Sequence, residues 1–302
     1  MSTFPRTATE STGADVIHDI GYRPYTGERL GRGYATRSLF VHSARGAYGL
    51  SRSAISKVLP MLLFAAVCLP ALIIVAVVIM AEMDEMPFEF TDYVIFVVAV
   101  PAIFVAAQAP QLLSKDLRFA TVPLYFSRPL TRSDYVRAKF AAMTVATFVL
   151  LATPLVILYV GALLAELPFG EHTEEFLGSL VGAVAFSLLL AGLSLVIASV
   201  TPRRGLGVAA IITVLMVSYG FASTLQGIAE DSGDAAGHTA AGWFGLLSPF
   251  TLADGVQSWL TGTEVAGITG PPGTAGGVVF LLVFIGSIGA CYGLLVRRYR
   301  RL

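Results

Sequence analysis

Six apolar runs, none of which contains a charged side chain, alternate with polar segments along the chain. Each run reaches about 20 residues, the length that an α-helix needs to cross a hydrocarbon core of about 30 Å. Lipid cannot hydrogen-bond the backbone, so each run is expected to form a helix. The pattern predicts an all-α, polytopic membrane protein. The six predicted transmembrane helices are residues 58–80, 93–113, 140–165, 176–200, 205–225 and 276–296.

Charge divides the segments between these runs into two kinds. All 20 lysines and arginines lie before the first run, between the second and third, between the fourth and fifth, or after the sixth. The other three segments carry 14 of the 20 acidic residues and no basic one. Basic residues gather on the cytoplasmic side of a membrane. We therefore expect a multi-pass protein of the cytoplasmic (inner) membrane with both termini in the cytoplasm.

Composition agrees with this interpretation. Only 13% of the residues are charged, against about 25% in soluble domains. The formal net charge of zero does not point to any partner by itself. The lipid bilayer is the expected surrounding, and no nucleic-acid partner is expected.

The chain before the first run has two parts. Residues 1–36 are polar and are expected to form a cytoplasmic tail that is partly disordered. Residues 37–57 place apolar side chains on one arc of a helix and arginines on the opposite side. This pattern predicts an amphipathic helix in the cytoplasmic interface, with arginines toward anionic headgroups, although a soluble helix packed on the body would show it too. The apolar arc consists of Leu39, Phe40, Ala47, Leu50 and Ala54, and the arginines are Arg37, Arg45 and Arg52.

The longest outer segment, residues 226–275, turns apolar in its second half. Ser248 is suited to cap a helix that has Pro249 in its first turn. Apolar positions follow at helical spacing, and both tryptophans of the chain lie in this segment. The segment predicts an extracellular short helix or re-entrant hairpin before the last span, and an ordinary folded outer cap is the alternative.

Familiar catalytic and metal motifs are missing from the sequence. There is no glycine-rich phosphate loop ending in lysine, no HExxH and no CxxC, so this chain is expected to bind no cofactor and to be no enzyme. Glu171, His172, Glu174 and Glu175 could hold a cation, but a solvated acidic loop is the favoured interpretation, and no metal is expected.

The apolar runs also lack Asp, Glu, Lys, Arg and His, the side chains that ion-coupled carriers use within the membrane. A transporter of this kind would have to take its energy from elsewhere. The candidates for a substrate path are polar or aromatic residues inside the runs, and hydrogen bonding between helices is the alternative role for the two glutamines. These candidates are Gln108, Gln111, Tyr159 and Tyr219.

Residues 115–139 form a charged cytoplasmic segment that is much longer than a turn between two helices requires. The helix of the second run is expected to protrude through it and to end or kink near Pro123. Leu124, Tyr125 and Phe126 follow as an apolar patch, residues 127–129 as a turn, and Thr131 with Asp134 as a capping box. A hydrophobic tip with a basic rim is typical of a surface that binds another protein.

Three sequence blocks in this segment resemble the type-2 family of ATP-binding-cassette (ABC) exporter permeases. They are KDLRxxT from residue 115, YFSRPLTR from residue 125 and YVxxK from residue 135. Six spans, cytoplasmic termini, an amphipathic helix before the first span and a Ser-Pro-Phe step in the last outer segment also fit that family. The resemblance covers residues 37–302, although residues 226–275 are longer than in many members.

The resemblance implies a transporter subunit. Two permease chains, expected as a homodimer, would form the substrate path within the membrane domain of residues 58–302. Two copies of a separate ABC ATPase subunit would bind ATP and Mg²⁺ beneath them. The cytoplasmic segment would be the coupling helix that is seated on that ATPase. The residues implied to touch the ATPase are Lys115, Asp116, Arg118, Phe119, Pro123, Leu124, Tyr125, Arg128 and Pro129.

Two other classes of function stay open at this point. An integral-membrane enzyme would use side chains of the long outer segment, namely Asp231, Asp234, His238 or Asp254. A non-transporting membrane anchor or assembly subunit would need no substrate path. The absence of a recognised catalytic constellation argues against the enzyme, and the length of residues 115–139 argues against the anchor.

Overall fold

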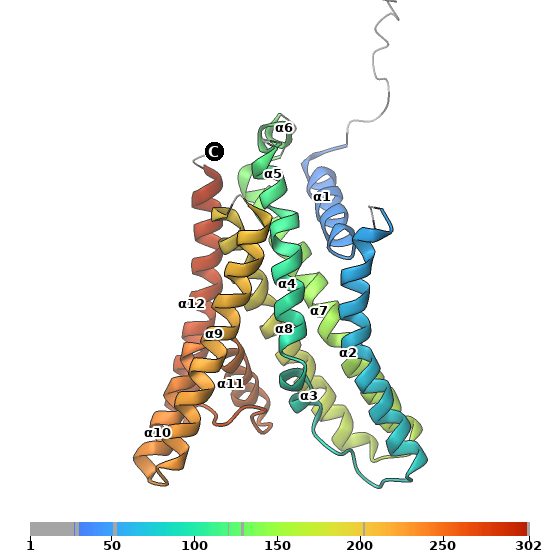
Figure 1. Cartoon of the computed structure of the whole chain (residues 1–302), viewed down its shortest axis with the longest axis vertical. Coiled ribbons are helices and arrows are strands. Elements are labelled where there is room, and N and C mark those ends of the chain that lie inside the picture. Colours follow the sequence, from blue (N-terminus) through green and yellow to red (C-terminus); the bar gives the residue numbers. More distant parts are fainter. Residues whose placement is uncertain are drawn as a thin grey trace, which may run out of the picture. The chain divides into compact units, whose positions relative to one another are not determined.

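Helices make up almost all of the chain that the computed structural model describes, which is residues 27, 30–50, 53–119, 121–127, 130–201 and 203–300, with only the backbone at 122 and 123. The polar tail predicted for residues 1–36 lies largely outside the described residues. Figure 1 shows the arrangement of the helices. In chain order they are α1 (Arg32–Ala47), α2 (Ile55–Met80), α3 (Phe90–Phe96), α4 (Ala99–Leu112), α5 (Ser114–Arg118), α6 (Val122–Phe126), α7 (Arg132–Leu164), α8 (Phe169–Val200), α9 (Arg204–Asp231), α10 (Ala235–Phe244), the 3₁₀ helix η1 (Gly245–Leu247), α11 (Pro249–Thr261) and α12 (Gly273–Arg300).

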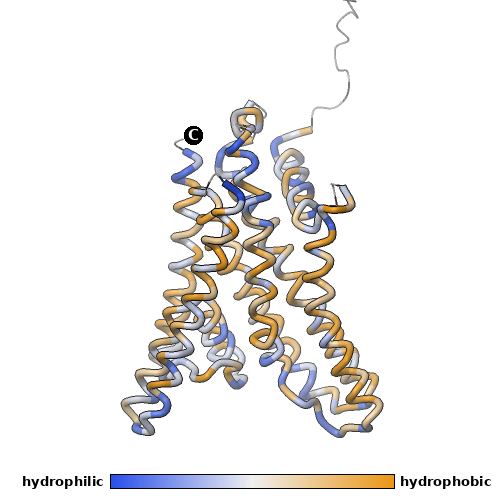
Figure 2. Tube along the Cα trace, viewed as in Figure 1, coloured by the Kyte–Doolittle hydropathy of each residue, from blue (hydrophilic) through white to orange (hydrophobic). Residues whose placement is uncertain are grey.

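Five of these helices, α2, α7, α8, α9 and α12, are long and apolar enough to cross a membrane. Their middle parts are hydrophobic, and hydrophilic residues gather toward their ends (Figure 2). The chain is therefore a multi-pass, all-helical membrane protein, as the apolar runs predicted. α7 and α8 pack side by side along much of their length, and each contributes more residues to the buried core than any other helix.

The second apolar run is not one straight helix, which corrects the sequence prediction. α3 and the following helix, Ala99–Arg118, are bent by 56° at a short break. Pro101 explains the break, because proline has no N–H to donate to the carbonyl of Val97 and its ring crowds that carbonyl. The chain uses the tighter bonds Val98 N to Ile95 O and Val100 N to Val97 O, 3.1 and 2.9 Å long, at this point.

The helix predicted for residues 37–57 has other bounds in the structure: α1 starts at Arg32, within the predicted tail, and ends at Ala47. Gly49 follows in the left-handed region with φ of 69°, and the amide of Leu50 donates to the carbonyl of Arg45 at 3.0 Å. This is a Schellman motif, which ends a helix at a glycine. Tyr48 then fixes the end of α1, because its hydroxyl donates to the carbonyl of Ala146 at 2.6 Å. Leu50, which we predicted on the apolar arc, is exposed beyond the helix.

Replacing Gly49 by alanine is expected to destabilise the protein by about 2 kcal/mol or more. A left-handed non-glycine residue costs about 1–2 kcal/mol, and the new Cβ would lie 2.5 Å from the carbonyl oxygen of Ser56. Thermal unfolding in detergent measures the effect. Gly33→Ala is the matched control, because a Cβ there meets nothing within 4 Å and alanine favours the helix. Equal melting of the two variants would show that this turn does not hold α1 in place.

The long outer segment folds into α10, η1 and α11, which lie against α9, α8 and α12. The predicted cap is confirmed: Ser248 accepts a hydrogen bond from the amide of Phe250 at 3.2 Å, and Pro249 opens α11. Two glycines let α11 approach its neighbours closely. A Cβ on Gly182 of α8 would overlap the side chain of Gln257, and one on Gly277 of α12 would lie 2.1 Å from the ring of Trp259.

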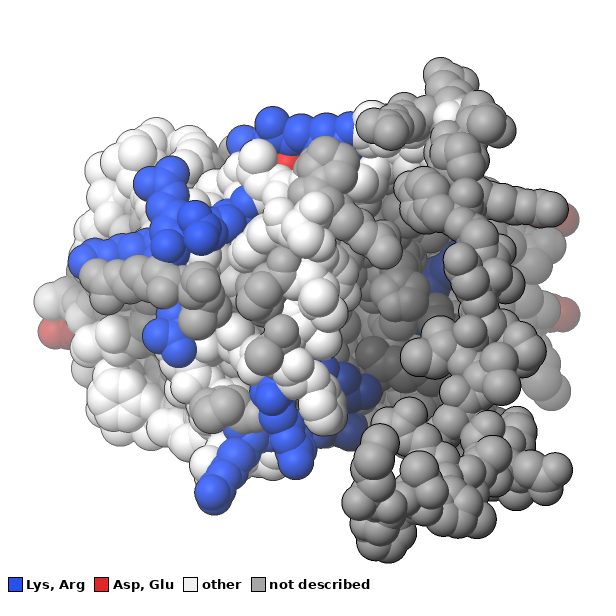
Figure 3. Space-filling model, turned by 90° about the horizontal axis from the view of Figure 1, so that it is seen from above, with Lys and Arg blue, Asp and Glu red and all other residues white. Residues whose placement is uncertain are grey.

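Charge separates along the bundle as well as along the chain. The described lysines and arginines belong to α1, α5, the first turns of α2 and α9, the first eight residues of α7 and the end of α12, or directly precede α9. These segments lie at one end of the bundle (Figure 1), here called the basic end, and Figure 3 shows that face. Asp116 and Asp134 are the only described acids in these segments. The other described acids lie between α2 and α4, from the end of α7 to the second turn of α8, or from the last turn of α9 to the loop before α12.

Candidate functional site

The predicted coupling segment is a pair of short helices, α5 and α6, at the basic end (Figure 1). α5 continues α4 after a turn at Leu113 and ends at Arg118, so the protruding helix is shorter than predicted. Pro123 does not end that helix but lies in the first turn of α6, where the missing N–H needs no partner. Between them the amide of Thr121 donates to the carbonyl of Asp116 at 3.0 Å, which closes the turn.

A buried ion pair fixes α5 to α7. The Nζ of Lys139 lies 3.0 Å from Oδ2 of Asp116, with side chains 8% and 15% exposed, and it also donates to the carbonyl of Leu112 at 3.0 Å. The hydroxyl of Tyr135 donates to the same carboxylate oxygen at 2.6 Å. Asp116, which the family resemblance placed on the ATPase surface, therefore points inward and holds the segment in position.

An aromatic cluster performs the same task for α6. The ring of Tyr135 lies 5.5 Å from that of Tyr125, 6.2 Å from Phe126 and 5.0 Å from Tyr299 near the end of α12, measured between centroids. The guanidinium of Arg132 lies over Phe126 at 5.5 Å. Tyr125 and Phe126 are thus half-buried, which corrects the prediction that they share an exposed patch with Leu124.

The outer face of the two short helices combines apolar and basic groups. Phe119 and Leu124 are 66% and 67% exposed. Lys115 and Arg118 are exposed as well, and the Arg118 guanidinium lies 5.7 Å from the ring centroid of Phe119. Arg128 and Pro129 lie outside the described residues, as does the side chain of Pro123. The structure thus leaves four of the nine predicted contact residues exposed along residues 115–124, and we call these four the α5–α6 face.

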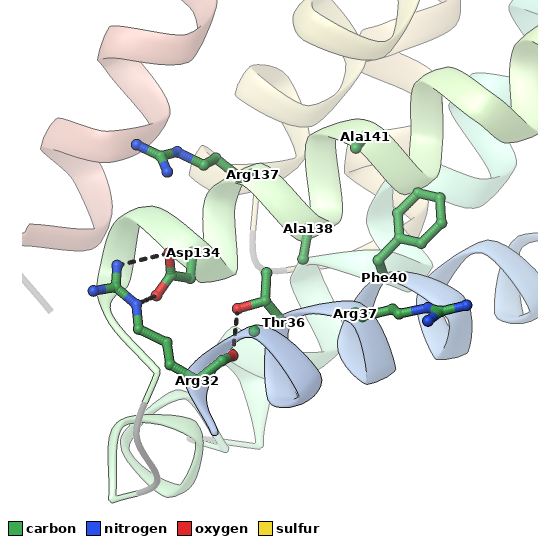
Figure 4. Close-up of a pocket in the computed structure, with 9 residues that line it drawn as sticks. Arg32, Thr36, Arg37, Phe40, Asp134, Arg137, Ala138 and Ala141 are labelled. Atoms are coloured by element: carbon green, nitrogen blue, oxygen red, sulfur yellow. Dashed lines mark hydrogen bonds and ion pairs between the residues drawn. The ribbon is translucent and has the colours of Figure 1, made fainter. Parts of the chain in front are cut away.

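The first residues of α7 are joined to α1. Thr131 and Asp134 form the predicted capping box, which is confirmed. Arg32 adds a two-pronged contact: its Nε lies 2.5 Å from Oδ2 of Asp134 and its Nη2 lies 2.9 Å from Oδ1 (Figure 4). The same Nη2 donates to the hydroxyl of Thr131 at 3.0 Å. One end of α7 therefore connects α1, α5, α6 and α12.

Sequence reasoning did not assign a role to Lys139, Tyr135 or Tyr299. A signal for Lys139 was present, because a lysine directly before an apolar run is costly unless it is paired. Asp116 is one of only two acids in the basic segments described here. Tyr299 gave no comparable signal, since its contact with Tyr135 joins residues that are far apart along the chain.

The four predicted substrate-path residues do not come together. Gln108 of α4 is buried, and its Nε2 has no hydrogen-bond partner among the described residues. Gln111, on the same helix, is half-buried. The ring of Tyr159 on α7 stacks on Phe176 at 4.5 Å, and its hydroxyl lies 3.0 Å from that of Thr173. Tyr219 on α9 instead contacts the ring of Phe250 in α11 at 5.6 Å.

Two of the outer residues predicted for an enzyme, Asp234 and His238, each have a partner of their own. Asp234 caps α10 by accepting from the amide of Gly237 at 2.6 Å, and this bond lowers its pKa. The Nδ1 of His238 lies 2.5 Å from Glu230.

Asp254 is instead buried in α11 and accepts from the amide of Gly267 at 2.9 Å. Nearer the start of α8, the Nδ1 of His172 lies 3.5 Å from a carboxylate oxygen of Glu175. Among the described residues, no group of three His, Cys, Asp or Glu side chains is placed to hold a metal ion.

The α5–α6 face is therefore the best-formed candidate site within the described residues. A comparison with known protein families finds no family model that matches this chain, and a search of the curated proteins finds no relative.

Proposed function

We propose that this chain is the permease subunit of an ATP-powered exporter. In this proposal the basic end faces the cytoplasm, and the bent pair of α3 with α4 and α5 is the second of six spans. Two copies of the chain form the substrate path as a homodimer. A separate ABC ATPase subunit, present twice, binds ATP and Mg²⁺ and docks on the α5–α6 face.

The observation that carries this proposal is the contrast between the two sides of α5 and α6. Their inner side is tied to α7 and α12 through Asp116, Lys139 and the ring of Tyr135. Their outer side exposes Phe119 and Leu124 beside basic groups. An exposed apolar pair on a rigidly held element, at the end of a membrane protein that lacks charges in its apolar runs, suits a lever driven by another protein.

The same contacts suggest how force would pass into the membrane. When nucleotide-driven closure of the ATPase moves α5 and α6, the buried pair carries the movement to α7 and the aromatic cluster carries it to α12. Rigid packing transmits such displacements rather than absorbing them. Because α4 runs directly into α5, the movement would reach α4 as well as α7 and α12.

Replacing Phe119 and Leu124 together by aspartate is expected to weaken ATPase association by at least about 30-fold, since truncating an interface hot spot costs about 2 kcal/mol or more. Both side chains are exposed, so the melting temperature should not change. Co-purification from the native membrane and ATP hydrolysis by the co-purified subunit measure the effect. Tyr125 is a poor target, because its ring packs on Tyr135.

The matched control is Phe119→Leu with Leu124→Met, which keeps both positions apolar and should retain the ATPase. If the aspartate variant is folded and still binds the ATPase as the control does, the docking assignment is wrong. If the native protein brings no ATPase with it, the transporter proposal itself fails.

A further inference from the structure

A groove of about 540 Å³ lies beside the loop that joins α11 to α12. The loop is found toward the end of the bundle opposite the basic end, here called the outer end (Figure 1). Ser258 and Trp259 line the groove from the last turn of α11, and Glu264, Val265 and Ile268 line it from the loop. The groove thus combines one carboxylate with a hydroxyl, an indole and aliphatic groups.

The loop that forms one wall of the groove is held in place by buried side chains. Asp254 of α11 accepts a hydrogen bond from the amide of Gly267 at 2.9 Å. The Nε2 of Gln226, on α9, donates to the carbonyl of Thr269 at 3.1 Å. Both contacts lie within five residues of Glu264, so this carboxylate is presented by an ordered wall. A preformed wall lowers the entropic cost of binding a ligand.

Two different groups of the groove meet at Gly270. A Cβ on this glycine would lie 3.2 Å from the side chain of Val265 and 3.9 Å from Oγ of Ser258. The Ser258 hydroxyl is buried and donates to the carbonyl of Gly255 at 3.1 Å. Its proton is therefore in use, while its oxygen can still accept a hydrogen bond. A ligand in the groove would find an acceptor next to an aliphatic surface.

The groove lies in a negatively charged environment. Glu264 is the only charged residue of its lining, and the structure shows no ion pair between this exposed carboxylate and any described residue. Burial and three nearby carboxylates, including that of Glu264, raise the pKa of Glu89. All described lysines and arginines belong to segments of the basic end. Negative charge without such compensation concentrates cations at the outer end.

The rest of the lining favours an organic cation over a metal ion. Mg²⁺ and Ca²⁺ require several oxygen ligands, and Glu264 supplies the only carboxylate of the groove. Trp259 is half-buried against Gly277 and contributes an aromatic surface, which attracts ammonium groups. Ile268 is exposed at the groove, and an apolar ligand would cover it. The volume falls in the range of small-molecule sites, about 300–1,000 Å³.

We propose that this groove binds an organic ammonium ion that carries an apolar body. Glu264 pairs with the charged nitrogen, and the oxygen of Ser258 accepts from one of its N–H groups. Trp259, Val265 and Ile268 cover the apolar body. This inference does not depend on the transporter proposal, because it concerns binding at the outer end and requires neither a second copy nor an ATPase.

Fluorine NMR of the full chain in non-ionic detergent, titrated with para-(trifluoromethyl)benzylammonium, tests the site. The wild-type chain should bind this probe saturably at one site, and the matching benzyl alcohol at least about tenfold more weakly. Glu264→Gln should weaken binding of the amine about tenfold, or about 1.4 kcal/mol, as expected for the loss of a hydrogen bond to a charged group. Glu264 is exposed, so the melting temperature should not change.

A second variant tests the role of the hydroxyl. Ser258→Ala should weaken binding of the amine about threefold and leave binding of its N,N,N-trimethyl analogue unchanged, because that cation has no N–H to donate. Alanine is compatible with the helix at this position. If the variant weakens both cations equally, Ser258 does not accept from the ligand and the proposed site is wrong.

Glu85→Gln is the matched control, because it removes the same charge from an exposed residue between α2 and α3 that does not line the groove. It should change binding by less than twofold. A loss as large as that of Glu264→Gln would indicate diffuse attraction to the whole outer end and would overturn the proposal. Equal binding of the benzyl alcohol, or displacement of the amine by Mg²⁺ at equal concentration, would also contradict it. Melting temperatures of all variants establish that each remains folded.

Discussion

Replacing Lys139 by methionine is expected to destabilise the protein by about 3–5 kcal/mol, because it leaves the carboxylate of Asp116 buried without its cation. The ammonium group lies 3.0 Å from that carboxylate in the native structure, and neither side chain is more than 15% exposed. The hydroxyl of Tyr135 would remain as a neutral donor to Asp116 and would not replace the lost charge. Thermal unfolding in detergent measures the loss, and hydrogen exchange in residues 114–127 locates it.

A double-mutant cycle separates the ion pair from simple packing. Asp116→Asn alone should also destabilise, because the buried ammonium group of Lys139 then loses the carboxylate that lies 3.0 Å from it. The combined variant removes both charges and should recover most of the loss. Arg204→Met, which removes an exposed charge at the same end, should change stability by less than about 0.5 kcal/mol. Additive losses in the double variant would mean that the two charges do not stabilise each other.

The ion pair between Lys139 and Asp116 allows two defects in partner binding to be told apart. One is loss of the support that holds α5 and α6, and the other is loss of the exposed side chains that would contact the partner. Lys139→Met leaves Phe119 and Leu124 in the sequence but releases the element that presents them. The α5–α6 face would then bind a partner with lower affinity, because ordering it would cost conformational entropy on binding. The variant with aspartate at positions 119 and 124 should also lower affinity, but without any change in hydrogen exchange.

The transmembrane helices were predictable because their signal is local. An apolar run of about 20 residues has to be helical in lipid whatever its neighbours are. Residues 140–164 and 176–200 lie within the longer helices α7 and α8, whose polar first turns lie outside the apolar runs. The bend in the second run was not predictable from composition. A straight and a bent helix have the same hydropathy, and proline inside a membrane helix is often tolerated, so Pro101 alone did not decide it.

The candidate site was predictable in position but not in orientation. The length and charge of residues 115–139 marked the segment. Leu124, Tyr125 and Phe126 are neighbours of similar hydrophobicity, so the sequence does not show which of them face inward. That choice depends on Tyr135 and on Tyr299, which reaches the cluster from the far end of the chain. Likewise, the end of α1 was misjudged because the effect of Gly49 depends on backbone conformation rather than on polarity.

The outer segment lies between these cases. Ser248 and Pro249 fixed the start of α11 because capping is a local interaction. The close packing of α11 against α8 and α12 requires that Gly182 and Gly277 have no side chain. The sequence does not show this requirement, because it arises only from the contact between the helices. The packing of α11 also buries Asp254 and thereby changes the pKa of its carboxyl. From the sequence, Asp254 was only one of several acidic residues in the outer segments.

Asp254 is expected to make the protein less stable as the pH rises from about 4 to about 6. The pKa of this carboxyl is raised to about 6, mainly by burial and to a smaller extent by the nearby Asp92, while hydrogen bonds from the amides of Gly267 and Ala266 act in the opposite direction. In the unfolded chain the pKa is about 3.9. The folded state therefore binds the proton more tightly, so this contribution to stability is full below about pH 4 and is lost as the pH passes through 6.

The expected size of this effect is up to about 3 kcal/mol, from about 1.36 kcal/mol for each unit of pKa. Other groups titrate over the same range, so the test is the difference between two melting curves taken from pH 4 to 8 in the same detergent. Asp254→Asn cannot ionise but still presents an oxygen to the amide of Gly267. Its stability should match the wild type near pH 4 and exceed it above pH 6. Parallel curves at all pH values would show that Asp254 ionises as it does in the unfolded chain. They would also show that α11 does not shield this carboxyl from water.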